Sequence, residues 1–356
     1  MIGNFKKNPL SLQIDYSRFL PSSKEEKEKQ NVFRKPTTFF HDSMKRFSKN
    51  PVAMVSGIFV ILLILAVIFI PIFWPYSYSE QLRITYGVSD GTFNNLRPFH
   101  WSNTEKELIA NGAKLVPHIF GTDSGGRDYF IRVIYGARVS LTVGFFASII
   151  VLLIGSVYGA VSGYFGGKVD LIMMRIVDVI YSIPDLLIII LLSSVLKIVL
   201  GDSTNTFVTT LGSGMISIFI VFGLLYWVGM ARLVRGQVLT LKQEDFVLAA
   251  KASGAGGWWI IRKHLLPNAM SVIIVSAALQ IPSAIFTESF LSYLGLGVNA
   301  PMPSLGSLCA DAEGTIMYSD KLYQLLLPAF LICLIVLALN LLGDGLRDSF
   351  DPKLAK

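Results

Sequence analysis

The sequence predicts an all-α integral membrane protein with six transmembrane helices. Hydrophobic residues make up 53% of the 356 positions and charged residues only 15%, which is typical of a chain whose main solvent is lipid. A helix needs about 20 apolar residues to cross a hydrocarbon core of about 30 Å. Runs of that length cover residues 52–74, 139–162, 177–199, 213–233, 269–294 and 322–343.

The segment 1–51 precedes the first run and is predicted to be a cytoplasmic tail. Its charged stretch KEEKEKQ, at 24–30, is typical of a solvated segment. Nearer the membrane, apolar and basic side chains recur at helical spacing, which predicts an interfacial lead-in helix in contact with membrane lipid. The apolar residues are Phe39, Phe40, Met44 and Phe47, and the basic ones are Lys45, Arg46 and Lys49.

The distribution of Lys and Arg predicts the orientation in the membrane. With the N-terminus inside, the cytoplasmic segments 1–51, 163–176, 232–268 and 344–356 hold 22 of the 31 Lys and Arg residues. Cytoplasmic loops carry such an excess in membrane proteins. We therefore expect a multi-pass protein of the cell membrane with both termini in the cytoplasm.

The segment 75–138 is then an extracellular connection between the first two spans. It contains several aromatic residues and prolines, and turn signals such as Ser89-Asp90-Gly91. These features predict a small folded cap outside the membrane.

Cysteine and histidine positions predict neither a disulfide framework nor a metal site. The two cysteines lie in the fifth-to-sixth connection and in the sixth span, and no two histidines are one helical turn apart. These residues are Cys309, Cys333, His41, His100, His118 and His264.

Four glycines recur every four residues near the end of the second span: Gly155, Gly159, Gly163 and Gly167. Together they form a smooth helical face, which predicts close packing of a neighbouring helix. The alternative is a flexible hinge near the membrane surface at Gly166-Gly167, because glycine adopts many backbone conformations.

Pro184 in the third span predicts a kinked helix, because proline lacks an N–H donor and frees a carbonyl that needs another partner. Asp185 beside it becomes a candidate for the wall of a translocation path. Asp178 is expected to pair with Arg175, three residues away, near the inner surface.

Glu288 is a carboxylate within the fifth span, where burial in lipid would be costly, so it should face protein or water. Two roles are open. Glu288 lines a translocation path, or it satisfies backbone groups where the helix is broken at Gly295-Leu296-Gly297.

The polar loop 234–268 contains EDFVLAAKASGAGGWWIIRKHLLP, from Glu244 to Pro267. Ala249, Ala250 and Gly254, with Leu266-Pro267 further on, resemble the EAA loop of ABC importer permeases. That resemblance implies a short coupling helix seated in a groove of an ATP-hydrolysing subunit. Leu248 stands where the family has an acidic residue. The expected coupling residues are Glu244, Asp245, Ala249, Ala250, Gly254 and Pro267. The alternative is an ordinary cytoplasmic loop whose alanines and glycine reflect helix propensity and a C-cap.

A second resemblance covers about 39–355. GTDSGGRDYFIRVIYGARVSL, IVDVIYSIPDLLI, TESFLSYLGLGVNAPMPSLGSL and NLLGDGLRDSFDPKL follow one another, as in the C-type permease subunits of oligopeptide, dipeptide and nickel importers. The first phrase contributes Gly121, Asp123, Gly126, Arg127, Asp128, Arg132, Gly136, Ala137, Arg138 and Leu141. The long N-terminal tail and the long extracellular segment depart from the family pattern.

The resemblance implies an ABC importer type I permease fold that forms half of a pathway for di- or oligopeptides, or for nickel or another small solute. The implied partners are a second, B-type permease, two ATPase subunits and an extracellular substrate-binding protein, with no nucleic acid. GYFGGKV at 163–169 lacks the P-loop spacing. We therefore expect no cofactor and no enzyme activity in this chain, with ATP and Mg on partner subunits.

Two other classes are weighed against the importer. A proton-coupled carrier would use Asp178, Asp185, Glu288 and Asp344 as relay carboxylates, but it would need no docking helix. Gly254→Trp or Ala250→Arg should therefore stop an importer without affecting such a carrier. An intramembrane hydrolase would need a base beside its nucleophile, and no histidine lies within a predicted span.

Overall fold

The computed structural model describes residues 39–87, 91–201, 212–298, 301–313 and 321–350. The predictions for the tail before residue 39 and for Ser89-Asp90 lie outside these residues. The chain divides into two compact units, Met1–Met44 and Lys45–Lys356. Within the described residues, the regular elements are helices, and the isolated bridge is Thr122–Asp128.

Five helices are long and apolar enough to cross a membrane, and the count rises to six if one bent pair is a single span. The straight candidates are α3 (Pro51–Phe73), α6 (Tyr129–Phe165), Ser213–Leu241, Gly257–Tyr293 and α16 (Tyr323–Phe350). Helix α3 begins at Pro51, and proline suits this position because the first N–H groups of a helix have no partner within the helix. The side chain of Asn50 accepts hydrogen bonds from Val52 N and Ala53 N. Helix α2 (Phe39–Phe47) lies where the sequence predicted the lead-in helix.

Four helices extend past the predicted spans; α16 is one of them, because it ends at Phe350 rather than at 343. α6 begins at Tyr129 rather than at 139. The fourth span comprises α10 (Ser213–Val221), a π turn (Phe222–Tyr226) and α11 (Trp227–Leu241), and ends at Leu241 rather than at 233. The fifth comprises α13 (Gly257–Ile260), a π turn (Ile261–Leu265) and α14 (Leu266–Tyr293), and begins at Gly257 rather than at 269. Hydropathy reports only the stretch that prefers lipid, whereas backbone hydrogen bonds continue a helix into water.

The third predicted span is not one helix. α7 (Gly167–Ser182) and α8 (Asp185–Gly201) meet at a bend of 87°. Pro184 follows Ile183, which is extended at φ −91° and ψ 137°. Proline disfavours helical backbone in the residue before it and cannot donate a helical hydrogen bond. A kink was expected at Pro184, and the structure has a full break there.

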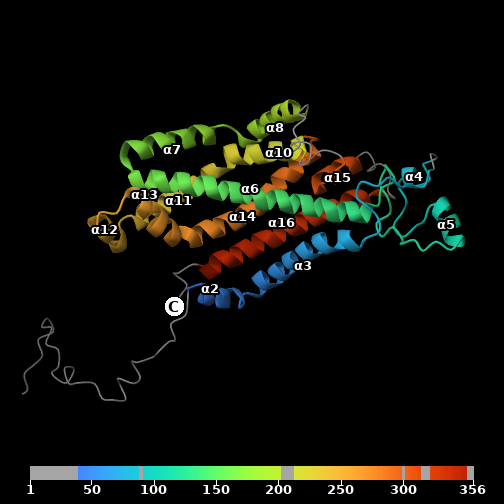
Figure 1. Cartoon of the computed structure of the whole chain (residues 1–356), viewed down its shortest axis with the longest axis horizontal. Coiled ribbons are helices and arrows are strands. Elements are labelled where there is room, and N and C mark those ends of the chain that lie inside the picture. Colours follow the sequence, from blue (N-terminus) through green and yellow to red (C-terminus); the bar gives the residue numbers. More distant parts are fainter. Residues whose placement is uncertain (1–38, 88–90, 202–211, 299–300, 314–320, 351–356) are drawn as a thin grey trace, which may run out of the picture. The chain divides into compact units, whose positions relative to one another are not determined.

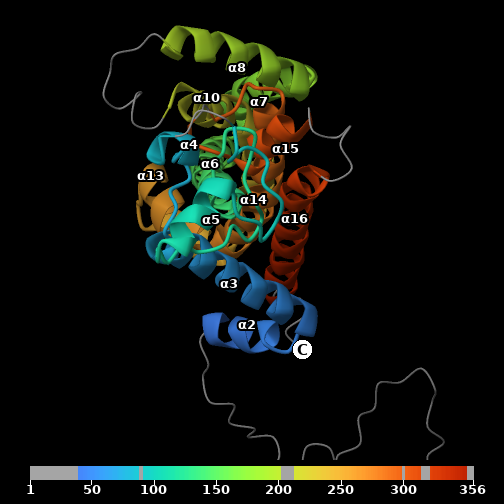
Figure 2. The ribbon, with the colours of Figure 1, turned by 90° about the vertical axis from the view of Figure 1, so that its right-hand side faces the viewer.

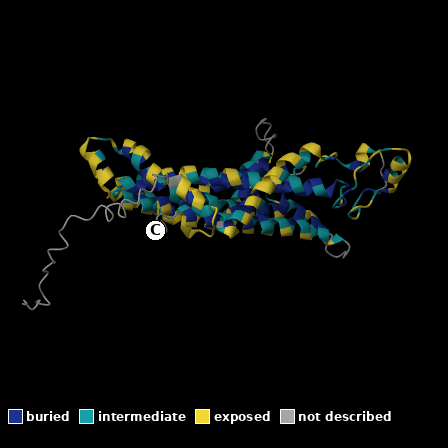
Figure 3. Ribbon diagram, turned by 90° about the horizontal axis from the view of Figure 1, so that it is seen from below, coloured by how far each residue is buried: buried dark blue, intermediate teal, exposed yellow. Residues whose placement is uncertain are grey.

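Helices α6, α11 and α14 pack along one another at the centre of the second unit, with α16 packed on α14 and α3 on α16 (Figure 1). α8 and α3 lie on opposite sides of this group, as the turned view also shows (Figure 2). Buried residues lie on the helix faces that point into the bundle, whereas exposed residues concentrate on the outer faces and at the ends (Figure 3).

The predicted glycine face exists, but only three of its four members contribute. A Cβ at Gly155 would lie 2.6 Å from Met230 Cβ, and one at Gly163 would lie 2.9 Å from Arg235 O. At Gly159 it would lie 2.3 Å from Ala231 O. These glycines therefore allow α6 and α11 to approach closely. Gly167 was placed wrongly: it has φ +53° and open space around it, because α6 already ends at Phe165.

The segment between α3 and α6 contains α4 (Leu82–Thr85) and α5 (Asn103–Ala110) and lies at the end of the second unit opposite to α12 (Asp245–Ala252) and α13 (Figure 1). At its centre, fully buried His118 contacts two buried carboxylates. Its Nδ1 lies 2.7 Å from Asp128 Oδ2, and its Nε2 lies 2.9 Å from Glu105 Oε1. Both ring nitrogens can donate only in the imidazolium form. Burial lowers the pKa of His118, but the bonds to Asp128 and Glu105 outweigh it and raise the pKa to about 9.

This histidine predicts a pH-dependent stability of the segment. Because the folded pKa of about 9 exceeds the pKa of about 6.5 of a histidine in the unfolded chain, the stabilisation should be complete below about pH 6.5 and be lost as the pH rises through about 9. We would measure how well residues 75–128 resist a protease between about pH 6.5 and about pH 9.5. This resistance should fall as the pH rises in the wild type and should change little in His118→Gln. Parallel profiles for the two proteins would contradict the prediction.

Candidate functional site

The polar loop between the fourth and fifth spans contains a short exposed helix, α12 (Asp245–Ala252). Leu248 and Ala249 are exposed and Ala250 is half-buried, whereas Val247 is fully buried. The helix therefore presents one side to solvent and holds to the bundle by the other. Glu244 and Asp245, its N-cap and first residue, are exposed.

The buried side of α12 is tied to three spans. Val247 belongs to a cluster with Val238 of α11, Ile261 of the π turn and Ala160 of α6. The ring of Tyr164, near the end of α6, lies 5.5 Å from Lys251 Nζ of α12. Displacement of α12 should therefore move the parts of α6, α11 and the fifth span that pack against it, since packed interiors deform little.

Gly254 ends α12 in a left-handed conformation, with φ +80°. Gly254 N donates to Lys251 O at 2.9 Å and Ala255 N donates to Ala250 O at 3.1 Å, which is the Schellman arrangement. Space around the missing Cβ is open. Pro267 lies in the first turn of α14, directly after the π turn. The π turn Ile261–Leu265, which is wider than an α-helical turn, therefore comes just before Pro267, which cannot donate a helical hydrogen bond.

Two exposed aromatic residues beside α12 were missed from the sequence. Trp258 is 57% exposed and Trp259 is 50% exposed. The signal was present in the GGWW of the loop, because exposed tryptophans are characteristic of protein interfaces. We call these two tryptophans, together with the exposed Leu248 and Ala249 of α12, the coupling surface.

The signature GTDSGGRD forms a structural junction just before and at the start of α6. Asp123 Oδ1 accepts bonds from Gly125 N and Arg127 N, and Oδ2 accepts from Arg127 Nε at 2.8 Å and from buried Arg132. Arg132 also lies 3.5 Å from Asp311, on α15 (Leu305–Glu313). These residues hold the segment between α3 and α6, helix α6 itself and α15 together.

Glu288 is completely buried between α14 and α6. Ser140 Oγ donates to its Oε2 at 2.7 Å, and Ser292 Oγ donates to its Oε1 at 2.7 Å. Ser292 Oγ also accepts from Val298 N, just after Gly295-Leu296-Gly297. Of the two roles left open, the structural one fits these contacts better, but Glu288 reaches the backbone at the helix end only through the hydroxyl of Ser292. Contact with solute in this conformation does not fit them.

A structural role for Glu288 predicts different effects of two substitutions. Glu288→Ala should destabilise the protein by about 2–4 kcal/mol, because it creates a cavity and leaves serine hydroxyls without their acceptor. Glu288→Gln keeps an acceptor oxygen and should largely preserve both assembly and transport. Size-exclusion yield and uptake rate together test this. Normal yield with lost uptake in Glu288→Gln would instead place the carboxylate on the path.

Asp178 does not pair with Arg175. Its Oδ1 accepts from Arg232 Nη2 of α11 at 2.8 Å. The expected pair was wrong because Arg175 competes for the carboxylate of Asp178 with Arg232, which the neighbouring helix α11 places beside it. Asp185 begins α8, but its side chain lies outside the described residues. Asp344 is exposed on α16.

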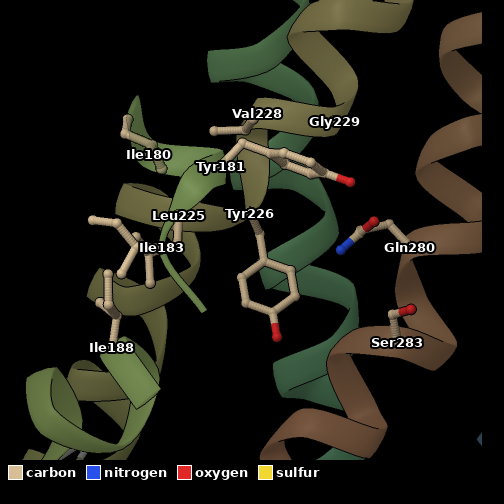
Figure 4. Close-up of a pocket in the computed structure, with 10 residues that line it drawn as sticks. All are labelled: Ile180, Tyr181, Ile183, Ile188, Leu225, Tyr226, Val228, Gly229, Gln280 and Ser283. Carbon is tan, nitrogen blue, oxygen red and sulfur yellow. The ribbon is translucent and has the colours of Figure 1, made fainter. Parts of the chain in front are cut away.

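A cavity of about 260 Å³ opens beside the break between α7 and α8. Tyr226, from the π turn of the fourth span, lies at its centre, with Gln280 and Ser283 of α14 across from it (Figure 4). A second cavity of about 280 Å³ shares Tyr226 and is lined otherwise by Pro184, Leu186, Ile189, Phe286, Thr287 and Phe290.

Comparison with known proteins identifies the family. Residues 155–356 match the family of binding-protein-dependent transport system inner membrane components, and residues 38–98 match the N-terminal transmembrane domain of oligopeptide transport permease C. The chain is 39% identical to the oligopeptide transport system permease protein OppC of Bacillus subtilis, over 96% of this chain and 99% of the relative. It is 41% identical to the dipeptide transport system permease protein DppC of the same organism, over 97% and 95%.

Among solved structures, an inward-facing form of the MetNI methionine ABC transporter aligns with 62% of this chain and 96% of its own, at 20% identity and a TM-score of 0.46. The two family matches and the near full-length identity above 30% place the chain without ambiguity. It belongs to the family of binding-protein-dependent transport system inner membrane components, as a permease subunit of the oligopeptide and dipeptide importer group.

Proposed function

We propose that this chain is the C-type permease of an ATP-driven importer of oligopeptides or dipeptides and forms half of its translocation pathway. The similarity to OppC and DppC over nearly the whole chain supports this cargo class. Nickel or another small solute is the alternative cargo for the same architecture.

The observation that carries the proposal is the coupling surface. An exposed helix of eight residues, held on a buried cluster shared by three spans, suits a docking element that receives force from another protein. In this proposal the element docks on an ATPase subunit, and its movement rearranges α6, α11 and the fifth span.

The proposed assembly contains a second, B-type permease, two ATPase subunits and an extracellular binding protein. ATP and Mg bind to the ATPases, so this chain needs no cofactor and catalyses no reaction itself. The end with α12 and α13 faces the cytoplasm together with both termini, and the end with α4 and α5 faces the binding protein.

A proton-coupled carrier gains no support from the candidate carboxylates. Asp178 is paired with Arg232, Glu288 is bonded to serines, and Asp344 is exposed. Within the described part of the chain, no hydrogen bond joins one of these carboxylates to another.

Purification from a mild detergent tests the proposal. Mass spectrometry should identify a second permease and ATPases with this chain, and the reconstituted complex should take up trialanine only with ATP. Uptake of nickel but not trialanine would favour the alternative cargo. A lone chain that takes up peptide with a proton gradient would overturn the proposal.

A further inference from the structure

Two irregular backbone segments and one proline-containing helix meet at the cavity of about 260 Å³ beside Tyr226. They are the break at Ile183-Pro184, the π turn Phe222–Tyr226 and α14 near its internal Pro282. Irregular backbone at membrane depth is tolerated where it lines a water-filled space or is buried in protein. π turns also occur often at functional sites.

Polar side chains in this cavity have unused hydrogen-bonding capacity. Gln280 is half-buried, and Ser283 and Tyr181 are exposed in the single chain. Within the described ranges, none of these three side chains makes a hydrogen bond. In contact with lipid, an unpaired amide or hydroxyl would cost free energy. These groups therefore require water or a polar ligand.

The cavity offers neutral hydrogen-bonding groups rather than charges. Among the described residues that line it, none is acidic or basic. The Cζ atom of Arg232 lies 4.2 Å from the centroid of the Tyr181 ring, but the charge of this arginine is already paired with Asp178. A glutamine amide and hydroxyls match the donors and acceptors of peptide main-chain amides, which are the same in every peptide sequence.

Tyr226 lines both cavities, of which the second is the more apolar. Its hydroxyl lies 2.9 Å from Thr287 Oγ1. Along α14, Gln280 and Ser283 precede Thr287, and Phe286 and Phe290 line only the second cavity. A solute that moves along α14 would pass Tyr226 between an apolar and a polar compartment.

We infer that Tyr181, Gln280 and Ser283 form a binding site for the main-chain amides of the transported peptide, with the Tyr226–Thr287 contact as its outer wall. This inference rests on the proposed peptide import. If the inference holds, peptides with different side chains bind equally well at this point of the pathway, whereas a peptide that lacks a main-chain N–H binds less well.

The first test uses the complete importer in proteoliposomes, with trialanine and its analogue methylated at the central amide nitrogen. The wild type should take up trialanine several-fold faster at limiting concentration. Gln280→Leu, of similar volume, should lower trialanine uptake roughly tenfold and bring the ratio of the two peptides towards one. Gln280→Asn should restore part of the preference. Ser271→Ala, elsewhere on α14, should match the wild type.

The outcomes separate the two proposals. If the wild type imports neither peptide, peptide import itself fails, and the inference fails with it. If the wild type imports trialanine and Gln280→Leu keeps the same rate and ratio, only the inference fails. Size-exclusion yield and basal ATP hydrolysis show whether each variant is assembled.

A second test asks whether the cavity is wet. In a Cys333→Ser background, Ser283→Cys should react with a charged methanethiosulfonate reagent, because only an ionised thiol in water reacts readily. Trialanine should slow this reaction. Leu337→Cys, in an apolar surface groove between α3 and α16, should stay unreactive. An unreactive Ser283→Cys would show that lipid or a partner helix fills the cavity, which overturns the inference.

Discussion

Ala249→Arg should abolish uptake while leaving the chain folded and inserted. Ala249 is an exposed residue of α12 on the coupling surface, so arginine there meets solvent in the single chain and should change stability by no more than about 0.5 kcal/mol. At a tightly packed interface, the added side chain keeps the two backbones apart. A loss at such a central position is typically about 2–4 kcal/mol, or roughly 30- to 1000-fold in affinity.

The measurement is co-purification of ATPase subunits together with ATP-dependent uptake of trialanine. Ala110→Arg is the matched control, because Ala110 is also exposed in a helix of eight residues, α5, at the opposite end. The control should retain the ATPases. If Ala249→Arg retains them and imports normally, α12 is not the docking element.

This variant is a sharper test than the two substitutions suggested by the sequence. At Gly254 any side chain strains the left-handed C-cap, so Gly254→Trp mixes a folding defect with a docking defect. Ala250 packs on the buried cluster below α12, so Ala250→Arg has the same weakness.

Gly159→Leu should prevent α6 and α11 from packing. A Cβ at this position would lie 2.3 Å from Ala231 O and 2.9 Å from Arg235 N. Both neighbours are backbone atoms, which cannot move aside as a flexible side chain can. The helices must separate, and we expect a loss of about 3 kcal/mol or more, seen as a low yield and a lower melting temperature of the purified chain.

Gly236→Leu is the control on the facing helix. Gly236 lies within α11, with open space where a Cβ would be. Leucine should therefore be tolerated or slightly stabilising, by up to about 1 kcal/mol from helix propensity. Equal melting temperatures for the two variants would show that α6 and α11 are not in close contact at Gly159.

Most of the candidate site could be located from the sequence, because its signals are local. The resemblance of Ala249, Ala250 and Gly254 to the EAA loop implied a short helix, and the alternative interpretation gave Gly254 as a C-cap; the structure has α12 with Gly254 at C′. Pro184 predicted a disturbance in the third span. The free energies behind these signals, helix capping and the missing proline donor, depend on a few neighbouring residues.

Other features depended on which helices become neighbours. Asp178 meets Arg232 across a helix pair, and Glu288 meets Ser140 from another span. Neither partner is near in sequence, so no local pattern selects it. The cavity around Tyr226 likewise requires a π turn, a helix break and α14 to converge.

The amino-acid sequence alone was sufficient for the all-helical membrane class, the family resemblance and the position of the short helix α12 that we propose as the docking element. The preference of a segment for lipid and the capping of a helix are set by that segment's own residues. Only the tertiary structure decided where each helix ends, that Gly167 lies off the packing face, and that Glu288 is sealed inside. These outcomes depend on contacts between distant segments, whose energies exist only once the helices are packed together.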